Sequence, residues 1–220
     1  MTRSSKPKLY QCKECKEKYV KRNSTQKVCS WKCAILYAEK DTKKKQREEQ
    51  RKWNVKKAEI LDKLKSKSDH EADLQRIINK IARLIDRGSN CMMCDKELVT
   101  QGKSFRENGC HYHSRGANPT LRFNLFNIWI GCHSCNGEKG GNITGYDTEL
   151  IKLYGKEKWE YIKFDLVRET KPLHLTIDEI KEAKVKAMKI RNDLIELDQV
   201  FTPANRWLLR VKYNKKIGIN

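Results

Sequence analysis

Four cysteines in the middle of the chain have the spacing of metal ligands. They form two C-x2-C pairs, Cys91 with Cys94 and Cys132 with Cys135. Thiolates at this spacing typically bind one structural zinc ion. Polar residues lie between the pairs and directly after them: Cys110-His111-Tyr112-His113, Asn127 and Asn136. The sequence therefore predicts a zinc-stapled module that encloses a histidine and two asparagines.

These enclosed residues suit the hydrolysis of a phosphodiester. That reaction needs a base for water and a cation that neutralises charge on the phosphate and the leaving 3′ oxygen. His111 is the candidate base, because its ordinary pKa of about 6.5 suits proton transfer at neutral pH. Asn127 opens an apolar run that predicts a second strand, so it can bond the backbone of the histidine strand. Asn136, at the start of a short helix, offers an oxygen ligand for Mg²⁺ or Mn²⁺. This layout is similar to that of HNH-type (ββα-metal) nucleases.

Five further residues are candidates for the same site. In a regular strand His113 would share the face of His111, where it could bind metal or orient substrate. Glu138 is a second candidate for the divalent metal, on the turn where Lys139 could contact phosphate. Arg115 and Arg122 are candidate phosphate contacts, since guanidinium groups match phosphate geometry.

A second cysteine set lies near the N-terminus: Cys12, Cys15, Cys29 and Cys33. About 25 residues cannot build a core alone, so a second zinc ion would supply the folding energy. The alternative is a surface loop with reactive thiols. The charged stretch at 39–67 has twelve basic and six acidic residues. It fits either a long solvated helix or a flexible basic arm.

The composition indicates a polyanionic partner. The chain has 220 residues, with 48 basic and 28 acidic side chains and a formal net charge of +20. A positive charge of this size favours binding to nucleic acid, here DNA. A membrane role is not expected, because no apolar run is long enough to span a bilayer. Nine cysteines without a secretory signal indicate metal binding in a reducing cytoplasm.

Helices are expected to position these residues. Ser68 and Glu71 form a predicted capping box for a helix that ends at Gly88. Shorter helices are expected at 147–154 and 156–169, a Thr176-capped helix at 177–197, and a basic last helix after Thr202-Pro203. The expected fold is α+β and mostly helical. The expected parts are a zinc finger (1–38), a charged helical linker (39–67), an HNH-like module with flanking helices (68–170) and a basic helical extension (171–220).

The central residues also resemble one known family, the NinG (Rap) recombination proteins of lambda-like phages. The resemblance covers residues 9–195 and rests on these positions: His111-Tyr112, Ala117, Pro119, Leu121-Arg122-Phe123-Asn124, Asn127-Ile128, Cys132-x2-Cys135-Asn136, Lys139, Gly141-Asn142, Tyr146, Leu150 and Tyr154-Gly155. It implies a phage-encoded endonuclease that acts on D-loops and Holliday junctions in the cytoplasm of a bacterial host. It also implies two structural zinc ions, Mg²⁺ or Mn²⁺ for catalysis, and recombination proteins as possible partners. Because junction cleavage usually needs two coordinated sites, a homodimer is an open expectation.

Three positions depart from the family pattern. Cys110 stands where glycine is usual, Asn108 where an aspartate is usual, and Trp129 where a histidine is common. These departures leave the first ligand of the divalent metal unassigned. Two alternatives therefore stay open: a non-catalytic zinc-containing DNA-binding or recruitment factor, and an HNH endonuclease with sequence preference.

Overall fold

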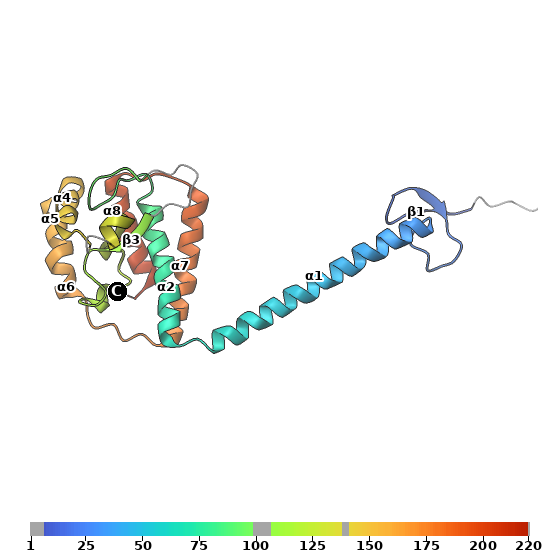
Figure 1. Cartoon of the computed structure of the whole chain (residues 1–220), viewed down its shortest axis with the longest axis horizontal. Coiled ribbons are helices and arrows are strands. Elements are labelled where there is room, and N and C mark those ends of the chain that lie inside the picture. The colour runs from blue at the N-terminus through green and yellow to red at the C-terminus, as the bar shows by residue number, and fades with distance from the viewer. Residues whose placement is uncertain (1–6, 99–106, 138–140, 220) are drawn as a thin grey trace, which may run out of the picture. The chain divides into compact units, whose positions relative to one another are not determined.

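The structure is a computed structural model that describes residues 7–98, 107–137 and 141–219. It divides into two compact units, Met1–Leu64 and Lys65–Asn220. Helices dominate both units, and the strands form two small antiparallel hairpins (Figure 1). The expected α+β, mostly helical class is confirmed.

The first unit is a cysteine-rich hairpin that leads into one long helix. The hairpin pairs β1 (Leu9–Gln11) with β2 (Lys18–Val20). Helix α1 (Trp31–Lys63) begins at Ser30, whose side chain accepts a hydrogen bond from the Cys33 amide at 3.3 Å. None of the 33 residues of α1 is buried. The charged stretch is therefore a solvated helix of roughly 50 Å, at 1.5 Å per residue.

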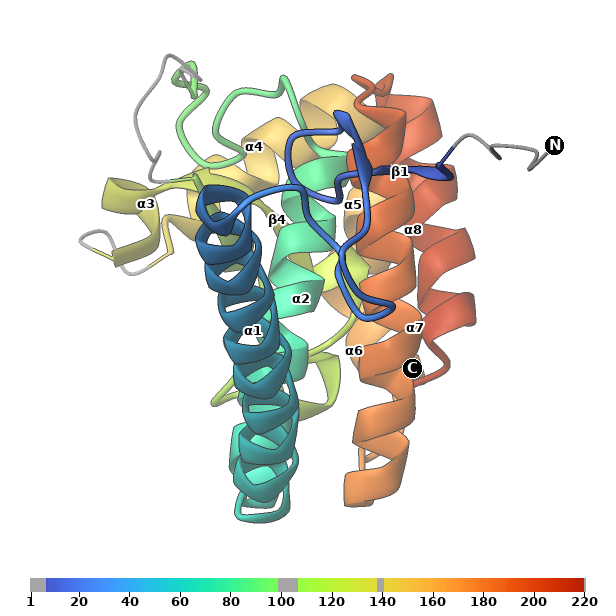
Figure 2. The ribbon, with the colours of Figure 1, turned by 90° about the vertical axis from the view of Figure 1, so that its right-hand side faces the viewer.

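The second unit surrounds the central hairpin with helices. Its elements in chain order are α2 (Lys67–Ile85), β3 (Glu107–His111), η1 (Pro119–Leu121), η2 (Leu125–Asn127), β4 (Ile128–Cys132), α3 (His133–Gly137), α4 (Ile143–Tyr154), α5 (Lys156–Glu160), the π-helical turn η3 (Tyr161–Asp165), α6 (Leu166–Glu169), α7 (Ile177–Leu197) and α8 (Pro203–Ile217). Helices α2 and α7 lie side by side (Figures 1 and 2).

The β3–β4 hairpin lies between two hydrophobic clusters. One cluster joins α2, α7 and α8 and includes Ile128 of β4. The other joins the central cysteines to α4, η3 and α6 and includes Cys110 and Trp129. In Figure 1 the hairpin accordingly lies between α2 on one side and α4–α6 on the other. Burial on both faces fixes the strand register and therefore the direction of each polar side chain.

Two expected helix starts are corrected. The cap of α2 is Ser66, with Asp69 completing the capping box, and not the predicted Ser68 with Glu71. Both pairs fit the same S-x-x-acid pattern, which cannot decide between registers two residues apart. Helix α4 begins at Ile143, four residues before the predicted start. The predicted range of α7 and the start of α8 at Thr202-Pro203 are confirmed.

The last helix is a structural support and not simply a basic terminus. Arg210 has no exposed surface and donates a hydrogen bond to Asp86 of the α2 cap at 2.8 Å. Its Nε donates to the Leu125 carbonyl at 3.0 Å, and its guanidinium lies 3.7 Å from the ring centroid of Trp129. The sequence alone does not show that this arginine is buried, because its partners lie far away in the chain.

Among the described residues, every helix is either too short or too polar to cross a bilayer.

Candidate active site

Two groups of four cysteines bring their sulfur atoms together. In each group, the first formed by residues 12, 15, 29 and 33 and the second by residues 91, 94, 132 and 135, all Sγ atoms lie within 4.8 Å of one another. Tetrahedral zinc at about 2.3 Å from each thiolate places the sulfurs about 3.8 Å apart. The Cys15–Cys29 and Cys94–Cys132 distances are 3.5 and 3.9 Å. Both groups could therefore hold zinc.

The second cysteine group fastens the hairpin to α3. Cys132 ends β4 and Cys135 lies in α3, while Cys91 and Cys94 form a turn after α2. The amide of Cys132 donates to the Cys91 sulfur at 3.2 Å, and the amide of Cys135 donates to the Cys132 sulfur at 3.4 Å. These contacts set the start of α3, which carries Asn136.

His111 is the last residue of β3, as the sequence predicts, and its ring is held by a backbone carbonyl. Its Nε2 lies 3.0 Å from the Arg122 oxygen. A carbonyl can only accept, so Nε2 carries the proton and Nδ1 is the acceptor of the neutral ring. Burial lowers the pKa of His111 below its usual value, and the charges of Arg115 and Arg122 act in the same direction. The neutral, basic form is therefore favoured at pH 7.

Asn127 joins the two chain segments around the histidine. It is fully buried at the end of η2, directly before β4. Its Oδ1 accepts from the His113 amide at 2.7 Å, and its Nδ2 donates to the carbonyls of His113 and Leu121 at 3.1 Å each. One side chain thus holds the segment that follows β3 against the loop before β4.

A polar groove of about 770 Å³ brings together three of the predicted site residues. His111, Asn136 and Arg115 all line it. Three separate segments contribute these groups: the end of β3, helix α3 and the loop after β3. A base, an amide oxygen and a guanidinium group therefore face one volume, which is the combination that phosphodiester hydrolysis needs.

The same groove contains residues that sequence reasoning missed. Glu107 lines it from the start of β3, and Arg76, Asn79 and Arg83 line it from α2. Glu107 lies four residues before His111, so strand alternation puts both on one face. The α2 residues follow helical i, i+3, i+7 spacing, which marks one stripe of a helix. The strand alternation and the helical spacing are both visible in the sequence. The sequence does not show where β3 begins or that α2 packs against it.

Helix α2 and β3 approach each other closely at Gly109. A Cβ atom added to Gly109 would lie 2.9 Å from the Cβ and 3.0 Å from the Cα of Asn79. Any larger residue at 109 would therefore push α2 away from the strand. Gly109 thus permits the α2 side chains to line the groove beside His111.

Two predicted residues point elsewhere. Because β3 ends at His111, His113 does not share its face, and its Nε2 instead donates to the Ile162 carbonyl in η3 at 2.9 Å. The side chain of Arg122 pairs with Glu71 at 2.6 Å and is absent from the described lining of the groove. Glu138 and Lys139 lie outside the described residues.

The three departures from the family pattern all lie in the β3–β4 hairpin. Cys110 pairs with Trp129 across the strands, so both side chains point to the face opposite His111. Both are buried in the second hydrophobic cluster, and burial raises the pKa of the Cys110 thiol, which therefore stays protonated. Asn108 lines the groove. The cysteine is thus a core residue, as its small apolar side chain suggested.

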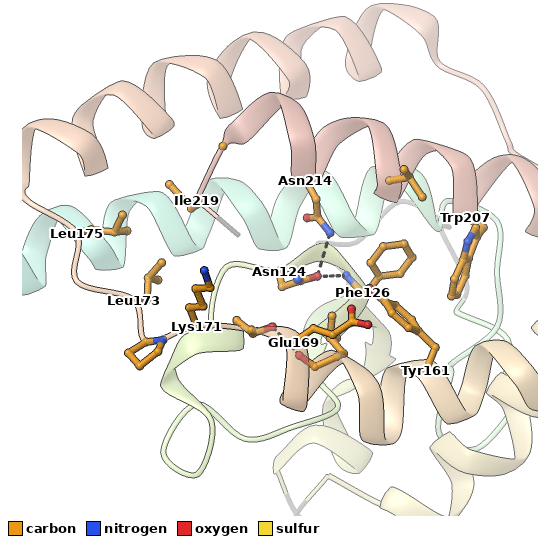
Figure 3. Close-up of a pocket in the computed structure, with 15 residues that line it drawn as sticks. Asn124, Phe126, Tyr161, Glu169, Lys171, Leu173, Leu175, Trp207, Asn214 and Ile219 are labelled. Carbon is orange, nitrogen blue, oxygen red and sulfur yellow. Dashed lines mark hydrogen bonds between the residues drawn. The ribbon is translucent and has the colours of Figure 1, made fainter.

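A second cavity, of about 830 Å³, lies away from these groups (Figure 3). Its described lining includes Phe126, Tyr161 and Trp207, but neither His111 nor Asn136. Asn214 of α8 donates to Asn124 at 2.9 Å, and Asn124 in turn accepts from the Phe126 amide at 2.9 Å. At this cavity α8 therefore supports the loop that carries Asn127.

Comparison with known proteins identifies the family. The family model described as "Bacteriophage Lambda NinG protein" matches residues 4–198. Protein ninG of Escherichia phage lambda is 32% identical over 131 residues, which are 60% of this chain and 60% of that protein. Protein ninG of Escherichia phage 933W is 30% identical over 60% of this chain and 61% of its own length, and that of Salmonella phage P22 is 30% identical over 60% of each.

The aligned part thus spans about 60% of the length of these curated relatives. No solved structure matches the chain. The family match includes both cysteine groups and the whole groove, and it ends before α8. The chain belongs to the bacteriophage lambda NinG family.

Proposed function

We propose that this protein is a metal-dependent DNA endonuclease that prefers branched recombination intermediates such as D-loops and Holliday junctions. The observation that carries the proposal is the groove that His111, Asn136 and Glu107 line together. The preference for branched DNA rests on family membership. Branch cleavage on two strands needs two such sites, so the proposal includes a homodimer on the junction, with recombination proteins as further partners.

His111 acts as the base in this proposal. Its neutral ring accepts a proton from the attacking water at Nδ1, while the Arg122 carbonyl keeps Nε2 protonated and the ring oriented. Asn127 positions the base indirectly, because it bonds the backbone of His113, two residues after the base, and the carbonyl of Leu121, next to Arg122. Arg115 contacts the phosphate as charge develops on its oxygens.

The oxygen atoms of the groove suit a divalent cation. Glu107 supplies a carboxylate and Asn136 an amide oxygen, which are the hard ligands that Mg²⁺ and Mn²⁺ prefer. When bound there, the ion would neutralise charge on the phosphate and on the leaving 3′ oxygen. Glu107 thus replaces His113 as our candidate for the first ligand, since His113 is bonded to η3.

The test is cleavage of a labelled four-way junction beside a linear duplex of matched sequence. Zinc-loaded wild type is assayed with Mg²⁺, with Mn²⁺ and with neither. The metal-free arm omits EDTA, because a chelator would also remove structural zinc. His111→Ala is the test variant. His174→Ala is the control, since His174 is exposed and absent from the described groove lining.

The expected result is metal-dependent cutting of the junction that His111→Ala abolishes and His174→Ala preserves. Tight binding without cutting in either metal would instead favour a DNA-binding factor. That second function has one observation of its own: α1 carries eleven basic and six acidic residues, a net charge of +5, with none buried. Cutting of the linear duplex at one fixed sequence would indicate a sequence-preferring nuclease.

A further inference from the structure

Helix α2 presents a basic stripe to the groove. Arg76 and Arg83 line the groove, and Lys80 lies between them on the same side of the helix. The opposite side of α2 is buried in the core through residues such as Ile77, Ile78 and Ile81. The stripe is thus held rigidly at a fixed distance from β3, where Gly109 contacts Asn79.

The charge of this stripe is only partly neutralised within the protein. Arg76 pairs with Asp73, but the same carboxylate accepts from Lys65 at 2.6 Å and from Lys184 at 3.0 Å. One negative charge is therefore shared by three cations. Arg83 donates to a neutral group, the Glu107 carbonyl, at 3.0 Å. An anion from outside the protein could therefore pair with these arginines.

The pKa of Lys80 agrees with an excess of positive charge along this side of α2. Burial lowers it below the usual value, and the positive charge of Arg83 lowers it further. Within the described lining of the groove, three guanidinium groups face one carboxylate, that of Glu107, a net charge of +2. Arg115 lies in the loop after β3, whereas the other two arginines lie on α2, so cations line the groove from two segments.

The spacing along α2 exceeds one phosphate. Arg76 and Arg83 are seven residues apart, which corresponds to about 10.5 Å along the helix axis. Two guanidinium groups at that separation contact different phosphates of a strand and not the two oxygens of one phosphate.

We infer that α2 is a backbone-binding element of this site, in which Arg76 and Arg83 bind phosphates beside the one that faces His111. The inference rests on the proposed function for the identity of the strand as DNA. It assigns a substrate-positioning role to a helix whose opposite side packs into the core. Because the contacts are to phosphates, they carry no sequence information.

The experiment measures DNA binding and not cleavage. The full zinc-loaded chain, without Mg²⁺ or Mn²⁺, is titrated against a fluorescent four-way junction at several salt concentrations, and gels verify that the DNA stays intact. Arg76→Gln is the test variant. Arg168→Gln is a closely matched control, because both side chains are exposed (77% and 75%) and each pairs with an aspartate three residues earlier.

Loss of one phosphate contact should reduce the slope of log K against log salt by about 0.9 and weaken binding about eightfold at 0.1 M salt. We expect this for Arg76→Gln and no change for Arg168→Gln. Arg83→Gln should have the same effect, with thermal unfolding measured in parallel because Arg83 also bonds β3.

Equal slopes and affinities for the two matched variants would overturn the inference, and the cleavage assay would stand unaffected. Conversely, a reduced slope for Arg76→Gln alone in a chain that cuts no DNA would support the binding role and refute the nuclease. A wild-type chain that binds neither junction nor duplex overturns both.

Discussion

The buried pair between Asp86 and Arg210 allows the support of the hairpin by α8 to be tested quantitatively. Both side chains are almost inaccessible, with 1% and 0% exposed. Removing one partner of such a pair leaves the other charged and buried, which costs about 3–5 kcal/mol. For a unit of this size each kcal/mol lowers the melting temperature by about 2–4 °C. Either Asp86→Ala or Arg210→Ala should therefore melt about 6–20 °C earlier.

The double variant gives the sharper result. A single substitution leaves an unpaired buried charge, and the second substitution removes that charge. The stability losses of the two single variants should therefore not add. We expect the double variant to be more stable than the sum of the single losses by about 0.5–3 kcal/mol. Some loss must remain, because Asp86 also accepts from the Ile130 amide at 3.1 Å and Arg210 donates to the Leu125 and Ile128 carbonyls.

The assay is calorimetry in zinc-buffered solution, which separates the unfolding of the second unit from that of the first. Glu182→Ala is the control, because its pair with Lys186 on α7 is exposed (67% and 41%) and should contribute less than about 1 kcal/mol. Single variants as stable as this control, or strictly additive losses, would refute a buried ion pair between α8 and the α2 cap.

Three further predictions concern the site. Cys132→Ser should lower bound zinc from two ions to one and unfold the second unit, as measured by metal release and circular dichroism. Gly109→Ala should cost about 1–3 kcal/mol in thermal unfolding, because the new methyl group meets Asn79, whereas Gly137→Ala, with open space around it, should cost less. The cleavage rate should fall as pH falls through the lowered pKa of His111, so the acid limb of kcat/KM should lie below 6.5, and a limb at or above that value would contradict the assignment of the base.

Local features of the sequence were enough for much of this structure. Cysteine spacing identified both groups of candidate zinc ligands, because each C-x2-C pair is a local motif. The Thr176 and Thr202-Pro203 signals located the last two helices, because a helix cap involves residues close together in the chain. The position of His111 at the end of β3 followed from the same local reading.

What the sequence could not show depends on contacts between distant segments. The groove joins α2 to β3 and α3, so the role of Arg76 and Arg83 depends on a helix–strand contact that no motif encodes. His113 was assigned to the face of His111 by strand alternation, which fails because β3 ends one residue after Cys110. The burial of Arg210 was not visible in the sequence, because its partner Asp86 lies 124 positions earlier.

That last separation has a consequence for how the chain acquires its structure during synthesis. The cysteine hairpin and α1 make their contacts within the first 64 residues, whereas the hairpin that carries His111 depends on a helix near residue 210. Contacts between such distant positions form slowly, because a long loop must close first. On the ribosome, which releases the N-terminal part first, the zinc finger can fold while the groove is still incomplete. In a nascent chain the cysteine hairpin and the basic helix α1 would thus form well before the groove is complete.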